Sequence, residues 1–334
     1  ALGDAHSLLW GVGYSDQQVI DADGKLTSPT LPTRYVSDDE TRVQQDSERQ
    51  IVSAYFQDRW SLTDRLELTA GARYDHYDDW GEEVSPRVAM VWRLADAHIL
   101  KAQYAKAFRP PTLQESYPGE NTFPGGVAIV DLTAEELASS ELSYIFSQGR
   151  KIFRATVFHT QLDDLIEFFQ NPGQAPRYRN LGEIESWGAE LEWEQYLGRN
   201  WKLMSNLAYV DAEDAITERP VVGSAELLAN LGLGWDITPT VSTGLRARYV
   251  GQREGWGDRV RADQDENFDS YTTLDATLTW QRAAGLAGLT LEAGVSNLAD
   301  VTYEMVPNPA QYPEGLTNEP RLWWVAAQYR FGGR

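Results

Sequence analysis

The chain has 334 residues, 42% of them hydrophobic, a composition close to that of an ordinary globular protein. Its formal net charge of −21 combines 50 acidic with 29 scattered basic residues, which argues against a nucleic-acid partner and favours solvated acidic loops or cation binding. Cysteine is absent, which excludes disulfides and thiolate metal sites, and no apolar run reaches the ~18 residues of a membrane helix.

Apolar and polar residues alternate with a period of two along most of the chain, which predicts β-strands with one apolar and one polar face. In "LTLEAGVSNL" the leucines and Val295 alternate with Thr290 and Glu292. Such segments predict about fourteen strands. They cover residues 5–16, 47–61, 65–79, 82–94, 97–109, 136–148, 151–168, 176–197, 200–212, 224–237, 240–253, 269–282, 287–299 and 320–331.

The connections between these strands alternate in length. Short ones occur at "LTDR", "ADA", "QGR", "LGRN", "TPT" and "RAAGLAG", whereas most of the others are long. A sandwich or a propeller has no reason to gather its long loops at one end, but an outer-membrane barrel has short periplasmic turns and long external loops. The sequence therefore predicts an all-β, transmembrane antiparallel β-barrel.

Aromatic residues near the short turns support this interpretation. Amphipathic rings collect at the level of the lipid headgroups, so rings at one height on several strands predict a membrane girdle. The alternative is that these are core aromatics of a soluble sandwich. The predicted girdle contains Trp60, Trp92, Tyr196, Trp201, Trp235, Trp280 and, on the last strand, Phe331.

The segment "YAKAFRPPTLQES" ends a strand abruptly, because Pro110 and Pro111 fix φ and lack the N–H that a ladder needs. Arg109 is thus expected where a strand leaves the membrane, either paired with a carboxylate of the barrel wall or in contact with a ligand. Charged residues of both signs are expected on the inward face, as in a wet lumen. They are Arg73, Arg87, Arg154, Arg246, Arg248, Glu67, Glu190, Glu192 and Glu292.

Several segments resemble those of TonB-dependent outer-membrane receptors, in that family's order. "AFRPPTLQE" is similar to the family's "FRAP-x-LQE" segment, and "YFQDRWSLTDRLELTAGARYD", "VSPRVAMVWR", "YRNLGEIESWGAELE" and "VSNLADVTYE" match further pieces. The resemblance implies a barrel of about 22 strands, of which residues 1–334 supply the C-terminal portion with about 14 strands. It also implies a plug domain and a TonB-contacting segment that this sequence does not contain, and a terminal aromatic, Phe331, that serves in assembly.

The resemblance further implies a receptor in the outer membrane of a Gram-negative bacterium that imports a scarce nutrient, here a ferric siderophore, without covalent chemistry or a bound cofactor. The expected partners are the siderophore, TonB and outer-membrane lipids. Ferric siderophores are often anionic and aromatic, which suits arginine and tyrosine donors on the external loops. The candidate ligand contacts are Arg109, Tyr117, Arg177, Tyr178, Trp256 and Tyr312.

Alternatives remain at this point: a passive pore of about fourteen strands, a receptor for cobalamin or another ligand, and a soluble carbohydrate-binding or hydrolytic domain. Haem is disfavoured because no histidine lies between His98 and His159, where the family's haem receptors carry one. Paired carboxylates such as Asp163 and Asp164 lack the partners of an enzyme site. The acidic loop at 254–269 lacks the spacing of a calcium loop, so solvation explains it better, and no metal site is expected.

Overall fold

The period-two segments form strands because extended chains bury or expose alternate side chains on opposite faces. The computed structural model describes residues 3, 5–19, 24–26, 34–36, 47–116, 131–169, 177–255, 267–306 and 316–331. Within these ranges, fourteen strands pair antiparallel, each with the next along the path, and a short fifteenth, β12, pairs with β11. Each of the fourteen overlaps a strand predicted from the sequence, so the all-β antiparallel prediction is confirmed.

The main strands of the sheet are β1 (His6–Gln18), β4 (Glu48–Thr63), β5 (Leu66–Tyr77), β6 (Gly81–Ala95), β7 (His98–Arg109), β8 (Glu135–Gln148), β9 (Lys151–Phe169), β10 (Arg177–Leu197), β11 (Trp201–Asp214), β13 (Leu227–Asp236), β14 (Val241–Val250), β17 (Tyr271–Gln281), β18 (Leu289–Ser296) and β19 (Leu322–Tyr329). The minor strands are β2 (Gly24–Leu26), β3 (Arg34–Val36), β12 (Arg219–Pro220), β15 (Arg253–Glu254) and β16 (Asn267–Phe268).

The helices are the single turn α1 (Leu113–Ser116) and a 3-10 turn at Ala283–Gly285. In the part of the chain that the structure describes, neither helix has the length or the apolar character needed to cross a membrane.

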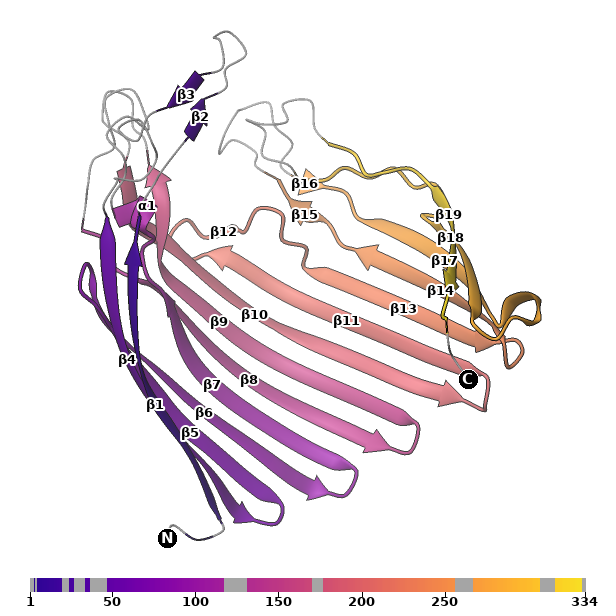
Figure 1. The fold of residues 1–334 in the computed structure, drawn as a ribbon, viewed down its shortest axis with the longest axis horizontal. Coiled ribbons are helices and arrows are strands. Elements are labelled where there is room, and N and C mark those ends of the chain that lie inside the picture. The colour runs from indigo at the N-terminus through magenta and orange to yellow at the C-terminus, as the bar shows by residue number, and fades with distance from the viewer. Residues whose placement is uncertain are drawn as a thin grey trace.

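The strands build one curved sheet with most of the short turns along one side, whereas the strand ends that lead to the long connections, and the turn 78–80 between β5 and β6, lie along the other (Figure 1). Strands β1 and β19 lie at the two ends of the pairing path, and among the described residues neither pairs with the other. The sheet is therefore open, and the alternative of a fourteen-stranded barrel closed on itself does not form.

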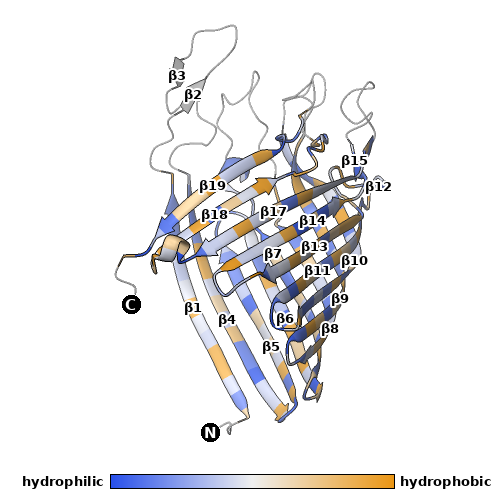
Figure 2. Ribbon diagram, turned by 90° about the vertical axis from the view of Figure 1, so that its right-hand side faces the viewer, coloured by the Kyte–Doolittle hydropathy of each residue, from blue (hydrophilic) through white to orange (hydrophobic). Residues whose placement is uncertain are grey.

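The register gives the sheet one apolar and one polar face. Directly paired residues of antiparallel strands share a face. Leu68 pairs with Trp60 on one side and with Met90 on the other, and the same row continues through Ala102 and Leu142. When these pairings are followed through all the strands, the apolar residues form one continuous face of the sheet. This face explains why so many large hydrophobic side chains are exposed. Apolar and polar residues alternate along the strands in Figure 2.

Glycines on the polar face make room for aromatic rings of the neighbouring strand. Gly11 pairs with Tyr55 and Gly294 pairs with Trp324. A Cβ at Gly11 would lie 2.6 Å from the Tyr55 ring, and a Cβ at Gly294 would clash with the indole of Trp324. Each ring thus covers the backbone of a glycine close to an edge of the sheet, which is a known way to stabilise glycine within a strand.

Candidate functional site

The polar face carries the charged residues that the alternation predicted. The inward positions named above, from Glu67 to Glu292, all lie on this face by register. Near the long-loop end, Arg73 donates from Nε and Nη2 to the two carboxylate oxygens of Asp75, at 2.7 and 2.6 Å. Asp75 is only 2% exposed, and its charge is compensated by this bidentate pair.

Arg109, the last residue of β7, joins two carboxylates. Its Nε and Nη2 donate to Glu135 at the start of β8, at 2.5 and 2.6 Å. Its Nη1 and Nη2 also donate to Glu115 of α1, at 3.0 and 3.2 Å. Glu135 accepts a further bond from the backbone N–H of Ile166 in β9, at 2.9 Å. Arg109 thus pairs with a wall carboxylate, which was one of its two expected roles, and its contact with a ligand stays a prediction.

A second arginine, Arg49 of β4, reaches the same segment. It donates from Nε and Nη2 to the carboxylate of Asp79, at 2.6 to 2.9 Å, and from Nη1 to the carbonyl of Pro111 at 2.7 Å. The two side chains are 4% and 3% exposed. Tyr77 lies under this guanidinium at 5.6 Å and packs with Trp80. Sequence reasoning missed Arg49 and Asp79, since nothing in the local pattern indicates that they meet.

The ends of β8, β9 and β10 are tied together by Asn180. Its amide donates to the carbonyls of Thr133 and Asp164, at 3.0 and 2.6 Å, and its Oδ1 accepts from the N–H of Thr133 at 3.0 Å. Asp164 has a φ of 57°, in the left-handed region where asparagine and aspartate are the least strained non-glycine residues. These bonds fix the start of β8 beside the Arg109 cluster.

Two of the other predicted ligand contacts lie within the described residues, at the long-loop end of β10. Arg177 and Tyr178 begin β10, where Tyr178 packs against Phe168 with ring centroids 5.3 Å apart. Tyr117, Trp256 and Tyr312 lie outside the described residues, as does most of the acidic loop at 254–269. Of the predicted set, the described residues include Arg109, Arg177 and Tyr178, and their contact with a ligand stays a prediction.

A further cluster, which the sequence did not indicate, lies where β14 and β17 meet their loops. The guanidinium of Arg253 is 5.1 Å from the centroid of Tyr271 and 5.8 Å from that of Phe268. Tyr271 in turn stacks on Tyr303 with ring centroids 3.6 Å apart. Burial, followed by the neighbouring Tyr271, raises the pKa of the Tyr303 hydroxyl, so this phenol stays neutral at physiological pH. The cluster is built for packing between strands and loop.

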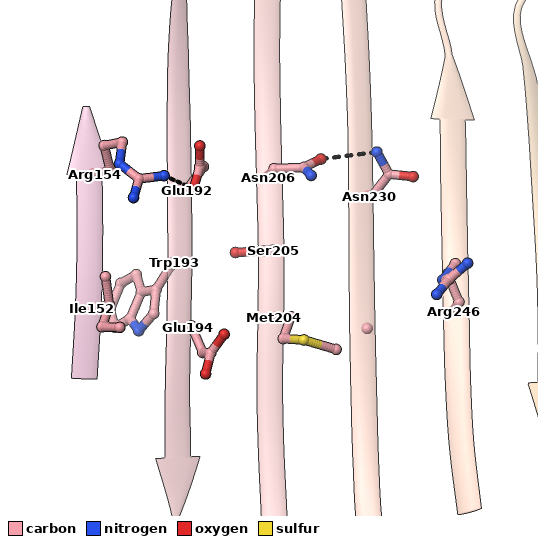
Figure 3. Close-up of a pocket in the computed structure, with 11 residues that line it drawn as sticks. Ile152, Arg154, Glu192, Trp193, Glu194, Met204, Ser205, Asn206, Asn230 and Arg246 are labelled. Carbon is pink, nitrogen blue, oxygen red and sulfur yellow. Dashed lines mark hydrogen bonds and ion pairs between the residues drawn. The ribbon is translucent and has the colours of Figure 1, made fainter. Parts of the chain in front are cut away.

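A polar hollow of about 540 Å³ lies along β9–β14 (Figure 3). Arg154 and Glu192 form an ion pair across two strands, and the Asn230 amide donates to Asn206 Oδ1 at 2.8 Å. Arg246 also lines the hollow. The hollow gathers hydrogen-bonding groups on the polar face but is open, as expected for part of a lumen wall.

Five of the aromatics predicted for the girdle lie on the apolar face at the short-turn end: Trp60, Trp92, Trp201, Trp235 and Trp280. Trp201 and Trp235 are direct partners with parallel rings 4.9 Å apart. Tyr196 is wrongly included, because it pairs with Lys202 on the polar face and packs under Arg150. Phe331 follows β19 and packs edge-on against Tyr329. Their contact with membrane stays a prediction.

All four histidines lie on the apolar face, away from the polar hollow: His6, His76, His98 and His159. Three of them have close partners. His6 Nδ1 is 2.7 Å from Asp58, His98 Nδ1 is 2.6 Å from the Tyr144 hydroxyl, and His159 Nε2 is 2.7 Å from Glu185. Within the described ranges, no three histidine or acidic side chains come close enough to hold a metal ion.

Known proteins resemble this chain over most of its length. An iron-regulated outer membrane virulence protein of Vibrio cholerae is 28% identical over 298 residues, which cover 84% of this chain and 44% of that protein. The ferric enterobactin receptor PirA of Pseudomonas aeruginosa is 24% identical, over 85% of this chain and 42% of that one. A heme/hemopexin utilization protein C of Haemophilus influenzae is 26% identical, over 72% and 38%. The chain spans less than half the length of these relatives.

Solved structures share the fold. A ferric enterobactin receptor mutant from Pseudomonas aeruginosa superposes with a TM-score of 0.77 at 20% identity, covering 98% of this chain and 51% of that one. The family model described as TonB dependent receptor-like, beta-barrel matches residues 1–298. This family comprises outer-membrane transporters and not enzymes. On the strength of that match and of the shared sheet, the chain belongs to the TonB-dependent receptor β-barrel family.

Proposed function

We propose that the protein of which this chain forms the barrel portion binds a ferric siderophore at its external face and imports it by TonB-coupled transport. The observation that carries the proposal is the similarity, over 84% of this chain, to an iron-regulated outer membrane protein. Relatives named as receptors for ferric enterobactin and ferrioxamine B, at 24% and 25% identity, support the same ligand class. The plug domain and the TonB-contacting segment belong to the proposal as well.

Haem is the second candidate, since one relative is named for heme and hemopexin. An axial haem ligand in a receptor must face the lumen or the external mouth. The four histidines of this chain instead lie on the apolar face, three of them with carboxylate or phenol partners. This arrangement favours the siderophore over haem.

The ligand class is tested by titrating the full-length receptor, purified in detergent, with a panel of ligands while its tryptophan fluorescence is followed. The panel contains a ferric catecholate, a ferric hydroxamate, haem and cobalamin. Quenching by a ferric siderophore at sub-micromolar concentration is expected. Binding of haem or cobalamin with no response to any ferric siderophore would refute the proposal.

The transport mode is tested in cells that accumulate radioactive iron from the bound siderophore. Uptake is expected to stop when TonB is deleted or when the inner-membrane proton gradient is collapsed. A passive pore would instead admit its solute at the same rate with or without TonB. Uptake that is independent of TonB would therefore favour the pore.

A further inference from the structure

Two arginines on the polar face hold the segment that leaves the wall after β7. Arg49 and Arg109 come from strands that are not neighbours. Each is bound bidentately to a carboxylate of the sheet, Arg49 to Asp79 in the turn between β5 and β6 and Arg109 to Glu135 of β8. Each then uses its remaining donors on the segment itself: Arg49 on the Pro111 carbonyl and Arg109 on the Glu115 carboxylate. We call these two side chains, with their four partners, the two-arginine clamp.

Within its described residues, 110–116, the segment has few backbone bonds that could attach it to the sheet. Pro110 and Pro111 have no N–H to give to a strand neighbour, and Pro111 is among the most deeply buried side chains of the described chain. The following helix, α1, has four residues, and one helical turn is not stable by itself in water. Side-chain bonds from the wall therefore replace the missing ladder.

At Arg109 the bonds to the wall are shorter than the bonds to the segment, whereas Arg49 binds the Pro111 carbonyl at 2.7 Å and Asp79 at 2.6 to 2.9 Å. Arg109 lies 2.5 and 2.6 Å from the Glu135 oxygens but 3.0 and 3.2 Å from those of Glu115. Glu115 also accepts from the N–H of Thr112 at 2.7 Å, and its own N–H donates to Thr112 Oγ1 at 3.2 Å. Glu115 thus orders the turn and connects it to the wall.

We propose that Arg49 and Arg109 are positioning residues for ligand binding: the two-arginine clamp fixes the orientation of α1 at the mouth of the barrel, and affinity for the ferric complex depends on that orientation without contact between either arginine and the ligand. The inference rests on the proposed function for its ligand. A segment held in its bound position loses less conformational freedom on binding, so the clamp raises affinity.

The test uses Glu115→Gln in the full-length receptor, because this change loosens the segment side and leaves both arginines paired with the wall. The matched control is Glu141→Gln. Glu141 lies on the polar face of β8, as Glu135 does, and accepts a hydrogen bond from Gln103 at 2.7 Å. The control therefore removes one negative charge outside the clamp. Heat-modifiable gel mobility checks that both variants assemble. Residues 1–334 contain no cysteine, and any cysteine elsewhere in the full-length receptor is first replaced by serine, so that a spin label at Ser116→Cys reports only on α1.

The Glu115→Gln receptor is expected to assemble normally, to show a more mobile label at position 116, and to bind the ferric siderophore about tenfold more weakly. The Glu141→Gln receptor is expected to match the parent in all three measurements. Unchanged affinity with Glu115→Gln would overturn the proposal, and so would weaker binding with an unchanged label, because that result means direct contact.

Failure of the proposed function gives a different result. If the parent receptor binds no ferric complex, the ligand assignment falls, but the label still reports on the clamp. Equal label mobility in Glu115→Gln and in the parent would then overturn the clamp as well.

Discussion

The strands from β4 to β11 and the later strands β13, β14, β17, β18 and β19 belong to the same sheet but differ in length. In the first group, β9 has 19 residues and β10 has 21, whereas in the second group β18 and β19 have 8 each. A transmembrane strand needs about 9–11 residues to cross the bilayer. We therefore expect β9 and β10 of the first group to extend well beyond the membrane on the long-loop side, and the strands of the second group to end close to its surface.

The two groups also use different interactions at their long-loop ends. The longer strands carry ion pairs there, including Arg49 with Asp79 and Arg109 with Glu135. Rings pack at the long-loop ends of both groups, such as Phe168 on Tyr178 in the longer strands and Tyr271 on Tyr303 in the shorter ones, where Trp324 also covers Gly294. The ion pair beside the shorter strands, Arg321 with Asp300, is far more exposed than Arg49 with Asp79. We therefore expect the buried ion pairs of the longer strands to hold the external mouth in place, and the shorter strands to contribute mainly to the lipid boundary.

The largest effect is expected for Arg49→Ala, which leaves the carboxylate of Asp79 buried and unpaired. Breaking a buried pair costs about 3–5 kcal/mol of unfolding free energy. The control is Arg65→Ala, whose pair with Asp96 is exposed to solvent and is therefore expected to contribute little to stability. Urea unfolding of the detergent-solubilised receptor measures both. Similar losses in the two variants would contradict the ranking of the ion pairs.

A smaller effect is expected to distinguish the part of the apolar face that lies in the bilayer from the part of the longer strands that extends beyond it. Leu231 is an exposed residue of β13 on the apolar face, so Leu231→Arg is expected to cost about 2–4 kcal/mol in the bilayer. Gln161 lies on the same face but far up the long strand β9, where it pairs with Glu185. The Gln161→Arg receptor is expected to assemble like the parent. Equal amounts of folded protein for the two variants in outer-membrane fractions would contradict the difference in height.

The smallest effect is expected for Gly294→Ala, because the added methyl group meets the Trp324 indole and displaces it. Such overpacking costs about 1–3 kcal/mol. Gly234→Ala is the control, since the nearest atom to a Cβ there, in Lys202, is 3.8 Å away. The urea midpoints of unfolding of the two variants decide whether the packing of the Trp324 ring over Gly294 contributes to the stability of the shorter strands. A midpoint for Gly294→Ala equal to that of the control would exclude the contribution.

The strands and their faces could be predicted from the sequence because a period of two is a local property. Tyr196 shows how that information can be misapplied: the alternation through Glu190, Glu192 and Glu194 already assigns Tyr196 to the polar face. Its position near a short turn gives its height in the membrane, but only its phase along β10 gives its face.

The contacts at the mouth could not be predicted in the same way. Arg49 binds Asp79, 30 residues away, and Pro111, 62 residues away, and such partners depend on how several strands curve. The sequence did leave pairing of Arg109 with a wall carboxylate as one alternative, but nothing local indicated that Glu135 and Glu115 would share it.

The most direct test of the central claim, that one face of this sheet meets lipid and the other lines the lumen, is a spin-label scan of β14. Single cysteines at positions 241–250 of the full-length receptor, in its own membrane, are each probed with oxygen, which partitions into lipid, and with a water-soluble nickel complex. Labels at the odd positions, in phase with Leu245 and Ala247, are expected to relax with oxygen, and labels at the even positions, in phase with Arg246 and Arg248, with nickel. A scan without a period of two, or with the phases exchanged, would contradict the assignment of the faces.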